Sequence, residues 1–249
     1  MQLQGKVAII SGGARGIGAA LATAFTNQGA RVVIGDILDV PAQALVGMLN
    51  STNADHPAAV IHLDATKMAD WDAAVALAQD RFGKLTTLVN NAGVHGRLGL
   101  EETSEEEWHR VIDSDLTSAW LGMKACIPAI RRAGGGSIVN TSSVYGLIAS
   151  GKATAYHSAK GGVLMLSKAA AVQYASENIR VNCIHPGLID TPMTETLPPD
   201  WKESLLQMTP MKRFGQAEEV AQAVVFLVSD EASFITGASL VIDGGLTAV

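Results

Sequence analysis

The sequence predicts an α/β fold: a Rossmann-like, doubly wound parallel sheet of seven strands flanked by helices, within one domain over residues 1–249. Short β-branched apolar runs alternate with segments whose apolar positions recur at helical spacing. A glycine-rich turn joins the first such run to the first helical segment. No linker or internal repeat interrupts the alternation, and 249 residues suit one domain with a sizeable core. Alternation of this kind is typical of a parallel sheet with helices on both faces.

The first strand is expected over 6–11, where KVAIIS is the short apolar run of a buried strand. It leads directly into the glycine turn, after which AALATAFTNQGA has the apolar spacing of a helix. The same alternation predicts further strands at 30–36, 58–63, 85–90, 136–142, 179–185 and 238–242. It predicts helices at 16–28, 40–50, 67–82, 104–132, 154–177, 200–208 and 216–229. Ligands of such sheets bind beyond the carboxyl ends of the strands, where the motifs described below all fall.

The glycine turn lies between a strand and a helix, the context in which a glycine motif indicates a dinucleotide-binding loop, although its spacing is G-x-x-x-G-x-G and not the commoner G-x-G-x-x-G. Gly12 allows the tight turn, Gly16 lets a ligand approach the backbone, and Gly18 lets the helix pack closely on the strand. The free N–H groups of the helix N-terminus then face a pyrophosphate. An ordinary glycine-rich turn is the alternative interpretation.

The end of the second strand indicates which cofactor binds. Asp36 lies eighteen residues after Gly18, where a carboxylate would hydrogen-bond the adenine ribose hydroxyls. Its charge would repel the additional phosphate of NADP, so we expect NAD to be preferred. Arg15 in the glycine loop is the complication, because a basic residue there can contact that phosphate. The alternative for Arg15 is a loop arginine that faces solvent.

A tyrosine and a lysine four residues apart, Tyr156 and Lys160, share one face of the helix expected at 154–177. A nearby ammonium favours the phenolate and lowers a tyrosine pKa, which is normally about 10. Ser143, thirteen residues before Tyr156, can donate a hydrogen bond to a substrate oxygen. The alternative is an ordinary Tyr–Lys pair on a solvated helix face.

Taken together, these motifs resemble those of the short-chain dehydrogenase/reductase family. The shared features are G-x-x-x-G-x-G at 12–18, NNAG at 90–93, the Ser143, Tyr156 and Lys160 set, and Pro186-Gly187. The resemblance extends over essentially the whole chain. It implies hydride transfer between NAD and a secondary alcohol or ketone, with Tyr156 as general acid/base and Lys160 also holding the nicotinamide ribose.

The resemblance also implies the remaining cofactor contacts. They are Ile17 in the glycine loop, Asp64 and Ala65 near the adenine, Asn91 and Gly93 along the adenosine half, and Pro186, Gly187, Ile189 and Thr191 at the nicotinamide end. Asn90 would brace the sheet. A helix N-cap remains the alternative for Asp64, and a plain turn the alternative for HPGLIDTP.

One residue departs from the family pattern. Asp115 stands where relatives usually have an asparagine that holds a local helix distortion and a water linked to the lysine. A carboxylate can accept but cannot donate a hydrogen bond, and near Lys160 its charge would oppose phenolate formation. We therefore expect a shifted pH optimum with retained activity; the alternative is a damaged proton relay.

The segment 188–214 is expected to form an apolar lid over the site. Its candidate pocket residues are Met193, Pro198, Pro199, Trp201, Met208 and Met211. Four other residues could reach the substrate: His95, Arg97, Tyr145 and His157. By analogy with relatives we expect a small apolar secondary alcohol or ketone, of the hydroxysteroid, cyclic or aryl kind.

Composition excludes several other classes of function. The net charge of −6 argues against a nucleic-acid partner, and Cys126 and Cys183 form neither a zinc pattern nor a disulfide framework, so no metal is expected. No apolar run approaches transmembrane length and no signal peptide is evident, so we expect a cytoplasmic protein. The apolar-rich helices at 104–132 and 154–177 pair subunits in relatives, which predicts a homotetramer.

Two other functions stay open. A 3-oxoacyl-carrier-protein reductase shares this active site and could dock its acidic carrier on Arg131 and Arg132, but it normally prefers NADP, and Asp36 argues against it. A nucleotide-binding protein without enzymatic activity, damaged by Asp115, is opposed by the intact Ser143, Tyr156 and Lys160.

Overall fold

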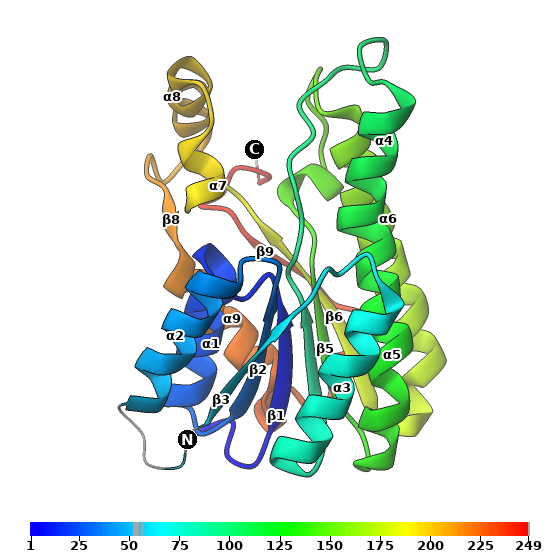
Figure 1. The fold of residues 1–249 in the computed structure, drawn as a ribbon. Coiled ribbons are helices and arrows are strands. Elements are labelled where there is room, and N and C mark those ends of the chain that lie inside the picture. The colour runs from blue at the N-terminus through cyan, green and yellow to red at the C-terminus, as the bar shows by residue number, and fades with distance from the viewer. Residues whose placement is uncertain (52–54, 56, 249) are drawn as a thin grey trace.

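The computed structural model describes residues 1–51, 55 and 57–248 and confirms the predicted sheet. Seven parallel strands lie in the order β3-β2-β1-β4-β5-β6-β9 (Figure 1). Their bounds are β1 Val7–Ser11, β2 Arg31–Asp36, β3 Ala58–His62, β4 Thr87–Asn90, β5 Gly136–Thr141, β6 Ile179–Pro186 and β9 Ser239–Ile242. The strand order reverses beside β1, so a crevice opens between the ends of β1 and β4, the usual ligand site of such sheets.

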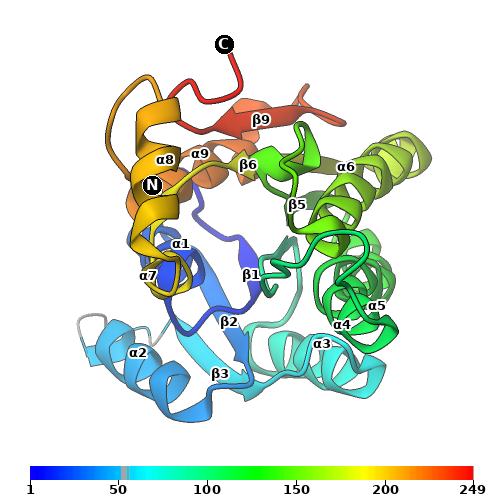
Figure 2. The ribbon, with the colours of Figure 1, turned by 90° about the horizontal axis from the view of Figure 1, so that it is seen from above.

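Helices cover both faces of the sheet. Figures 1 and 2 show α1, α2 and α9 on one side and α3, α5 and α6 on the other. The bounds are α1 Gly16–Asn27, α2 Asp39–Ser51, α3 Met68–Phe82, α4 Glu105–Ile112, α5 Ser118–Arg132, α6 Thr154–Tyr174, α7 Pro192–Glu195, α8 Pro199–Met208 and α9 Ala217–Val228. The helix–strand alternation thus gives the two helix layers that the apolar spacing predicted.

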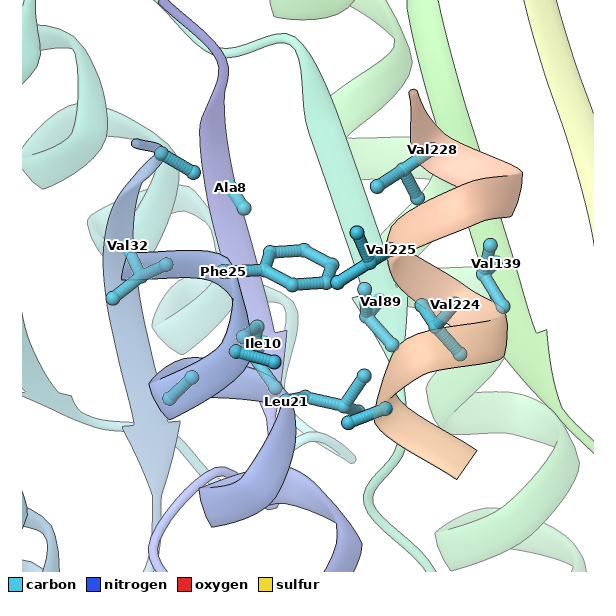
Figure 3. Packing of buried hydrophobic residues seen from close by; sticks show 14 of the residues in the cluster. Ala8, Ile10, Leu21, Phe25, Val32, Val89, Val139, Val224, Val225 and Val228 are labelled. Carbon is cyan, nitrogen blue, oxygen red and sulfur yellow. The ribbon is translucent and has the colours of Figure 1, made fainter. Parts of the chain in front are cut away.

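One apolar core lies between the sheet and the α1–α9 layer (Figure 3). Phe25 and Leu21 of α1 point toward Val224 and Val225 of α9, and all four side chains are buried. On the opposite face Trp71 of α3 is fully buried in a second core, and its indole N–H donates to the Ala65 carbonyl at 2.9 Å. Burial of both faces explains why the strands have apolar side chains at successive positions rather than alternating ones.

The helix expected at 104–132 is interrupted. Between α4 and α5 the chain forms a π-helical turn over Asp113–Thr117. A π-turn places one extra residue in the helix and is often found at functional sites. It points Asp115 inward, where that carboxylate is buried against Lys160 of α6. The apolar spacing alone predicts one continuous helix, because a single inserted residue changes the period only locally.

The segment 188–214 contains more structure than the sequence predicted. Besides the expected α8 it contains α7 and the short strand β7 (Ile189–Asp190), which pairs in parallel with β8 (Gly215–Gln216). Pro192 and Pro199 begin α7 and α8, where the missing N–H of proline removes no helical hydrogen bond. No helix among the described residues is long and apolar enough to cross a bilayer.

Candidate active site

A cavity of about 920 Å³ opens beyond the carboxyl ends of the strands. All but one of the predicted site residues line it: Gly12, Arg15, Gly16, Ile17, Asp36, Asp64, Ala65, Asn91, Gly93, Asp115, Ser143, Tyr156, Lys160, Pro186, Gly187, Ile189 and Thr191. Gly18 is the exception, and it has the packing role expected of it, since a Cβ there would collide with the carbonyl of Gly12. The fold therefore brings residues from eight separate parts of the sequence to one site.

Two positions of the glycine loop have little room for a side chain. Gly12 has φ +61°, and a Cβ on it would lie 2.8 Å from the Ala92 Cα. Gly16 has φ +55° and faces Thr191, whose Cγ2 would lie 3.4 Å from an added Cβ. Both positions therefore favour glycine for conformation and for space. The N-terminus of α1 begins at Gly16 with Arg15 exposed at its cap, so free backbone N–H groups and a positive charge line this end of the cavity.

Asp36 is buried at the end of β2 and lines the cavity. Oδ2 accepts from the Ala14 N–H and Oδ1 from the Leu38 N–H, each at 2.9 Å. These two bonds fix the carboxylate orientation and leave lone pairs for further donors, because an ionised carboxylate accepts about four hydrogen bonds. A ribose diol is a suitable donor pair for this position.

Asp64 forms a local turn with Thr66. Its Oδ1 accepts from the Thr66 N–H at 3.0 Å and from the Thr66 hydroxyl at 2.7 Å. The hydroxyl bond is the main reason that the pKa of Asp64 lies below its usual value. The N-cap alternative for Asp64 is wrong, since Lys67 occupies the N-cap of α3. Asp64 and its neighbour Ala65 instead line the cavity.

The NNAG segment ties the end of β4 to the glycine loop. The Asn91 amide donates to the carbonyls of Ser11 at 3.2 Å and of Gly12 at 3.0 Å. Asn90 points the other way and donates to Asn140 of β5 at 2.8 Å and to Ala119 of α5 at 3.1 Å. Asn91 therefore orders the cavity wall, while Asn90 braces the sheet behind it.

Ser143 is held from two directions. Its Oγ accepts from the Tyr145 N–H at 3.2 Å, which leaves the hydroxyl proton free to donate to another oxygen. Its carbonyl lies 2.8 Å from Nδ1 of the buried His185, whose Nε2 lies 2.7 Å from the Ser239 hydroxyl. A chain of contacts from β9 through β6 thus fixes the Ser143 backbone. The sequence did not reveal this role of His185, because the three residues meet only across neighbouring strands.

Tyr156 and Lys160 lie inside the molecule, so the solvated-face alternative is wrong. Their relative exposures are 8% and 4%. Lys160 Nζ lies 5.5 Å from the centre of the Tyr156 ring and donates to the Thr141 carbonyl at 3.2 Å. It also forms a buried ion pair with Asp115, 2.7 Å from Oδ1. Gly93 leaves room for this pair, since a Cβ there would collide with the Asp115 carboxylate.

Burial and the ion pair set the protonation of this cluster. Burial raises the pKa of Tyr156; the positive charge of Lys160 opposes that rise, while the negative charge of Asp115 adds to it. Lys160 therefore acts on the phenol in the predicted direction but does not outweigh burial. For Lys160 itself burial disfavours the charge, yet attraction to Asp115 and Tyr156 prevails and the pKa is raised. Burial also raises the pKa of Asp115, against the pull of Lys160.

The opposite end of the cleft is formed by the turn after β6. A Cβ on Gly187 would lie 2.8 Å from the Asp243 Cα, so the chain passes close to the C-terminal segment there. The Ile189 carbonyl accepts from the Thr194 hydroxyl at 2.7 Å, and both Ile189 and Thr191 line the cavity. The wall that these residues form faces the glycine loop.

The substrate candidates divide into two groups. Three of the four loop and helix residues, His95, Arg97 and Tyr145, line the cavity, as do Met193 and Trp201. The remaining candidates do not: His157, Pro198, Pro199, Met208 and Met211. His157 packs against the Tyr145 ring at 4.9 Å, and the two methionines are exposed because they lie on the outer side of their segment.

Several cavity residues carried no sequence signal, among them Lys152 and Leu246. Lys152 reaches the cavity from the loop before α6, and its Nζ lies 4.8 Å from the ring centre of Trp201 in α8. Leu246 reaches it from the segment after β9. Both belong to irregular segments without a local motif, so only their placement in the fold reveals them.

Known proteins are similar to this chain in sequence and in fold. The family model described as Enoyl-(Acyl carrier protein) reductase matches residues 12–247. The Trans-4-hydroxycyclohexanecarboxylate dehydrogenase of Sinomonas cyclohexanicum is 46% identical over 98% of this chain and 93% of its own length. The 3-alpha-(or 20-beta)-hydroxysteroid dehydrogenase of Mycobacterium bovis is 42% identical over 99% of this chain and 91% of its own length. The solved structure of Levodione Reductase superposes with a TM-score of 0.95 at 33% identity, covering 99% of each chain. The chain therefore belongs to the short-chain dehydrogenase/reductase family, as the resemblance of its motifs implied.

Proposed function

We propose that this protein is an NAD-dependent oxidoreductase that interconverts a cyclic secondary alcohol and its ketone, with Tyr156 as the general acid/base. The observation that carries the proposal is the convergence of Ser143, Tyr156 and Lys160 on the cavity whose other end contains Asp36. The two curated relatives support the substrate class, because their names describe dehydrogenases of a hydroxylated cyclohexane and of hydroxysteroids.

The residues divide the chemistry between them. The Ser143 Oγ accepts from the Tyr145 N–H, so its hydroxyl proton can donate to the substrate oxygen and orient that oxygen toward the phenol. Tyr156 takes the alcohol proton during oxidation and returns it during reduction. Lys160 keeps a positive charge beside the ring in both directions. The nicotinamide, when bound, supplies the hydride acceptor or donor.

The cavity fits a nicotinamide dinucleotide along its length. Gly12 permits the turn beside the Ala92 backbone, and the N-terminus of α1 at Gly16 would face the pyrophosphate. Asp36 would accept from the adenine ribose, and the turn at 186–191 would hold the carboxamide end. The fixed carboxylate of Asp36 favours NAD over NADP, while the exposed Arg15 remains free to face solvent.

The reductase of acyl-carrier substrates has weaker support as a second function. Arg131, one of its two candidate docking residues, already pairs with Glu177 at 2.6 Å. The non-enzymatic alternative also has little support, since Asp115 forms an ordered ion pair and leaves Ser143, Tyr156 and Lys160 together.

We also propose that the protein is a homotetramer in the cytoplasm, with the segment 188–214 as a lid. Large apolar side chains are exposed on the two long helices, among them Trp120 at 45%, Met165 at 62% and Val172 at 83%. Aromatic residues and Met are enriched at contacts between protein chains. Light scattering at micromolar concentration tests the assembly, and a monomer would contradict it.

The function is tested by initial rates with NAD and with NADP on secondary alcohols that range from cyclopentanol and cyclohexanol through phenylethanols to hydroxysteroids. We expect turnover with NAD that is highest for ring alcohols. Binding of NAD without turnover of any alcohol would contradict the proposal and favour the non-enzymatic alternative.

A further inference from the structure

The half of the cavity that would hold the substrate contains cationic side chains without carboxylate partners. Arg97 and Lys152 both line it, and the acidic residues of the cavity are elsewhere: Asp36 and Asp64 lie at the adenosine end, and Asp115 is paired with Lys160. Within the described part of the chain, neither Arg97 nor Lys152 forms an ion pair. An apolar alcohol gives no reason for this surplus of positive charge.

Arg97 has donors to spare. Its two Nη atoms donate to the carbonyl and hydroxyl of Thr196, at 3.0 and 2.6 Å, and both acceptors are neutral. Its Nε is buried without a hydrogen-bond partner among the described residues. A guanidinium has five N–H donors in a planar fork, and three of those of Arg97 have no acceptor among the described residues. Buried donors without partners are rare and often mark a position that a ligand completes.

The position of Arg97 is fixed relative to the catalytic tyrosine. The His95 ring lies 5.5 Å from the ring of Tyr156, and Arg97 follows two residues later, within about 7 Å along the chain. The loop is anchored by Arg110, whose Nη2 donates to the His95 carbonyl at 2.7 Å, and by the Thr154 N–H, which donates to the carbonyl of Leu98 at 3.0 Å. Tyr156 and Arg97 therefore line the same part of the cavity.

Lys152 lines the same cavity from the neighbouring loop, which the Thr154–Leu98 hydrogen bond joins to the loop of Arg97. Its Nζ lies over the Trp201 ring at 4.8 Å, a contact that leaves the charge unneutralised. His95 adds no charge near neutral pH, because burial and the neighbouring Arg97 and Lys160 lower its pKa to about 4. The charges that an incoming substrate meets are those of Arg97 and Lys152.

We propose that the substrate is a cyclic secondary alcohol that bears a carboxylate on the ring, and that Arg97 selects it by pairing with that carboxylate. The inference deepens the proposed function and rests on it. Lys152 contributes attraction at longer range, and the contact of Arg97 with Thr196 couples the bound anion to the segment 188–214. The expectation of a wholly apolar substrate is thereby replaced by one with an anionic end.

The test compares two alcohols of the same shape, 4-hydroxycyclohexanecarboxylate and 4-hydroxycyclohexanecarboxamide. We expect the native protein to favour the carboxylate by about tenfold or more in kcat/KM, mainly through KM, and less at high salt. Arg97→Gln abolishes that ratio and Arg97→Lys keeps part of it, since the charge survives but the fork does not. The matched control Arg81→Gln, which changes an exposed arginine of α3, keeps the native ratio.

Binding of an unreactive anion separates this inference from the proposed function. Calorimetry with cyclohexanecarboxylate and cyclohexanecarboxamide, with NAD present, is expected to show tighter binding of the anion to the native protein and to Arg81→Gln but not to Arg97→Gln. If cyclic alcohols are oxidised but the charged and neutral compounds bind equally and have equal kcat/KM, the inference is overturned and the proposed function stands. Absence of all turnover refutes the proposed function, and the calorimetry still decides whether Arg97 binds a carboxylate.

Discussion

Asp115 and Lys160 form an ion pair in the interior of the active site, with 2.7 Å between Oδ1 and Nζ and less than 5% of either residue exposed. The π-helical turn over Asp113–Thr117 aims the carboxylate inward, and the Val94 N–H donates to its other oxygen at 3.2 Å. An asparagine at this position would accept from the same N–H without adding charge. The carboxylate thus neutralises the cation beside the Tyr156 phenol, which is the particular electrostatic feature of this chain.

Replacing that carboxylate is expected to shift the pH dependence of catalysis. The negative charge of Asp115 raises the pKa of Tyr156, so Asp115→Asn lowers it, and the acidic limb of kcat/KM for alcohol oxidation moves down by about one pH unit. Asparagine keeps one oxygen that can accept from the Val94 N–H and loses the second acceptor, which faces Lys160. Asp113→Asn, an exposed change in the same turn, serves as control and keeps the native profile. Superimposable curves for Asp115→Asn and the native protein would show that the carboxylate has no special role.

Removal of the phenol oxygen is expected to abolish most of the activity without unfolding the protein. Tyr156→Phe keeps the buried ring and loses the proton-transfer group, so kcat/KM falls by about 10²- to 10⁴-fold. Binding of NAD and the thermal midpoint remain close to native, because the ring still fills its site. Tyr174→Phe, which removes a phenol oxygen outside the cavity, is the control. Near-native turnover by folded Tyr156→Phe would refute the role of this residue.

The carboxylate of Asp36 is expected to decide between the two cofactors. Asp36→Asn removes the negative charge and replaces one of the two oxygens that accept from the N–H groups of Ala14 and Leu38. We expect the KM for NAD to rise by about tenfold and the NAD-to-NADP ratio of kcat/KM to fall, because the repulsion of an additional phosphate is lost. The control Asp72→Asn, which changes an exposed residue of α3, should keep the native ratio. A preference for NADP in the native protein would already contradict this interpretation.

The fold was readable from the sequence because its signals are local. Each of the seven sheet strands lies within two residues of its predicted bounds, and the order of β-branched runs, glycine turn and helical periodicity sets the topology. The predicted site residues meet because the strands are parallel, so that motifs following different strands share one edge of the sheet.

What the sequence could not supply depends on contacts between distant segments. The Ser143–His185–Ser239 chain requires the pairing of β6 with β9, and the β7–β8 pair joins strands of only two residues each. The interruption between α4 and α5 changes the helical period for only a few residues. The pKa of Tyr156 was expected to be lowered by Lys160, but burial, which no local pattern measures, outweighs that charge.

The low pKa of His95 makes the folded protein sensitive to acid. The pKa of His95 is about 4 in the folded protein and about 6.5 in the unfolded chain. Between pH 6.5 and pH 4 the unfolded chain therefore binds a proton that the folded protein does not, so the stability falls as the pH falls. From pH 7.5 to pH 5 the loss from this residue is at most about 2 kcal/mol. His95→Phe keeps a ring against Tyr156 but cannot titrate, so urea unfolding at the two pH values should show a smaller difference than in the native protein. The control His109→Phe, on the exposed face of α4, should show the same difference in stability between the two pH values as the native protein. If His95→Phe is as sensitive to pH as the native protein, the acid-labile group lies elsewhere.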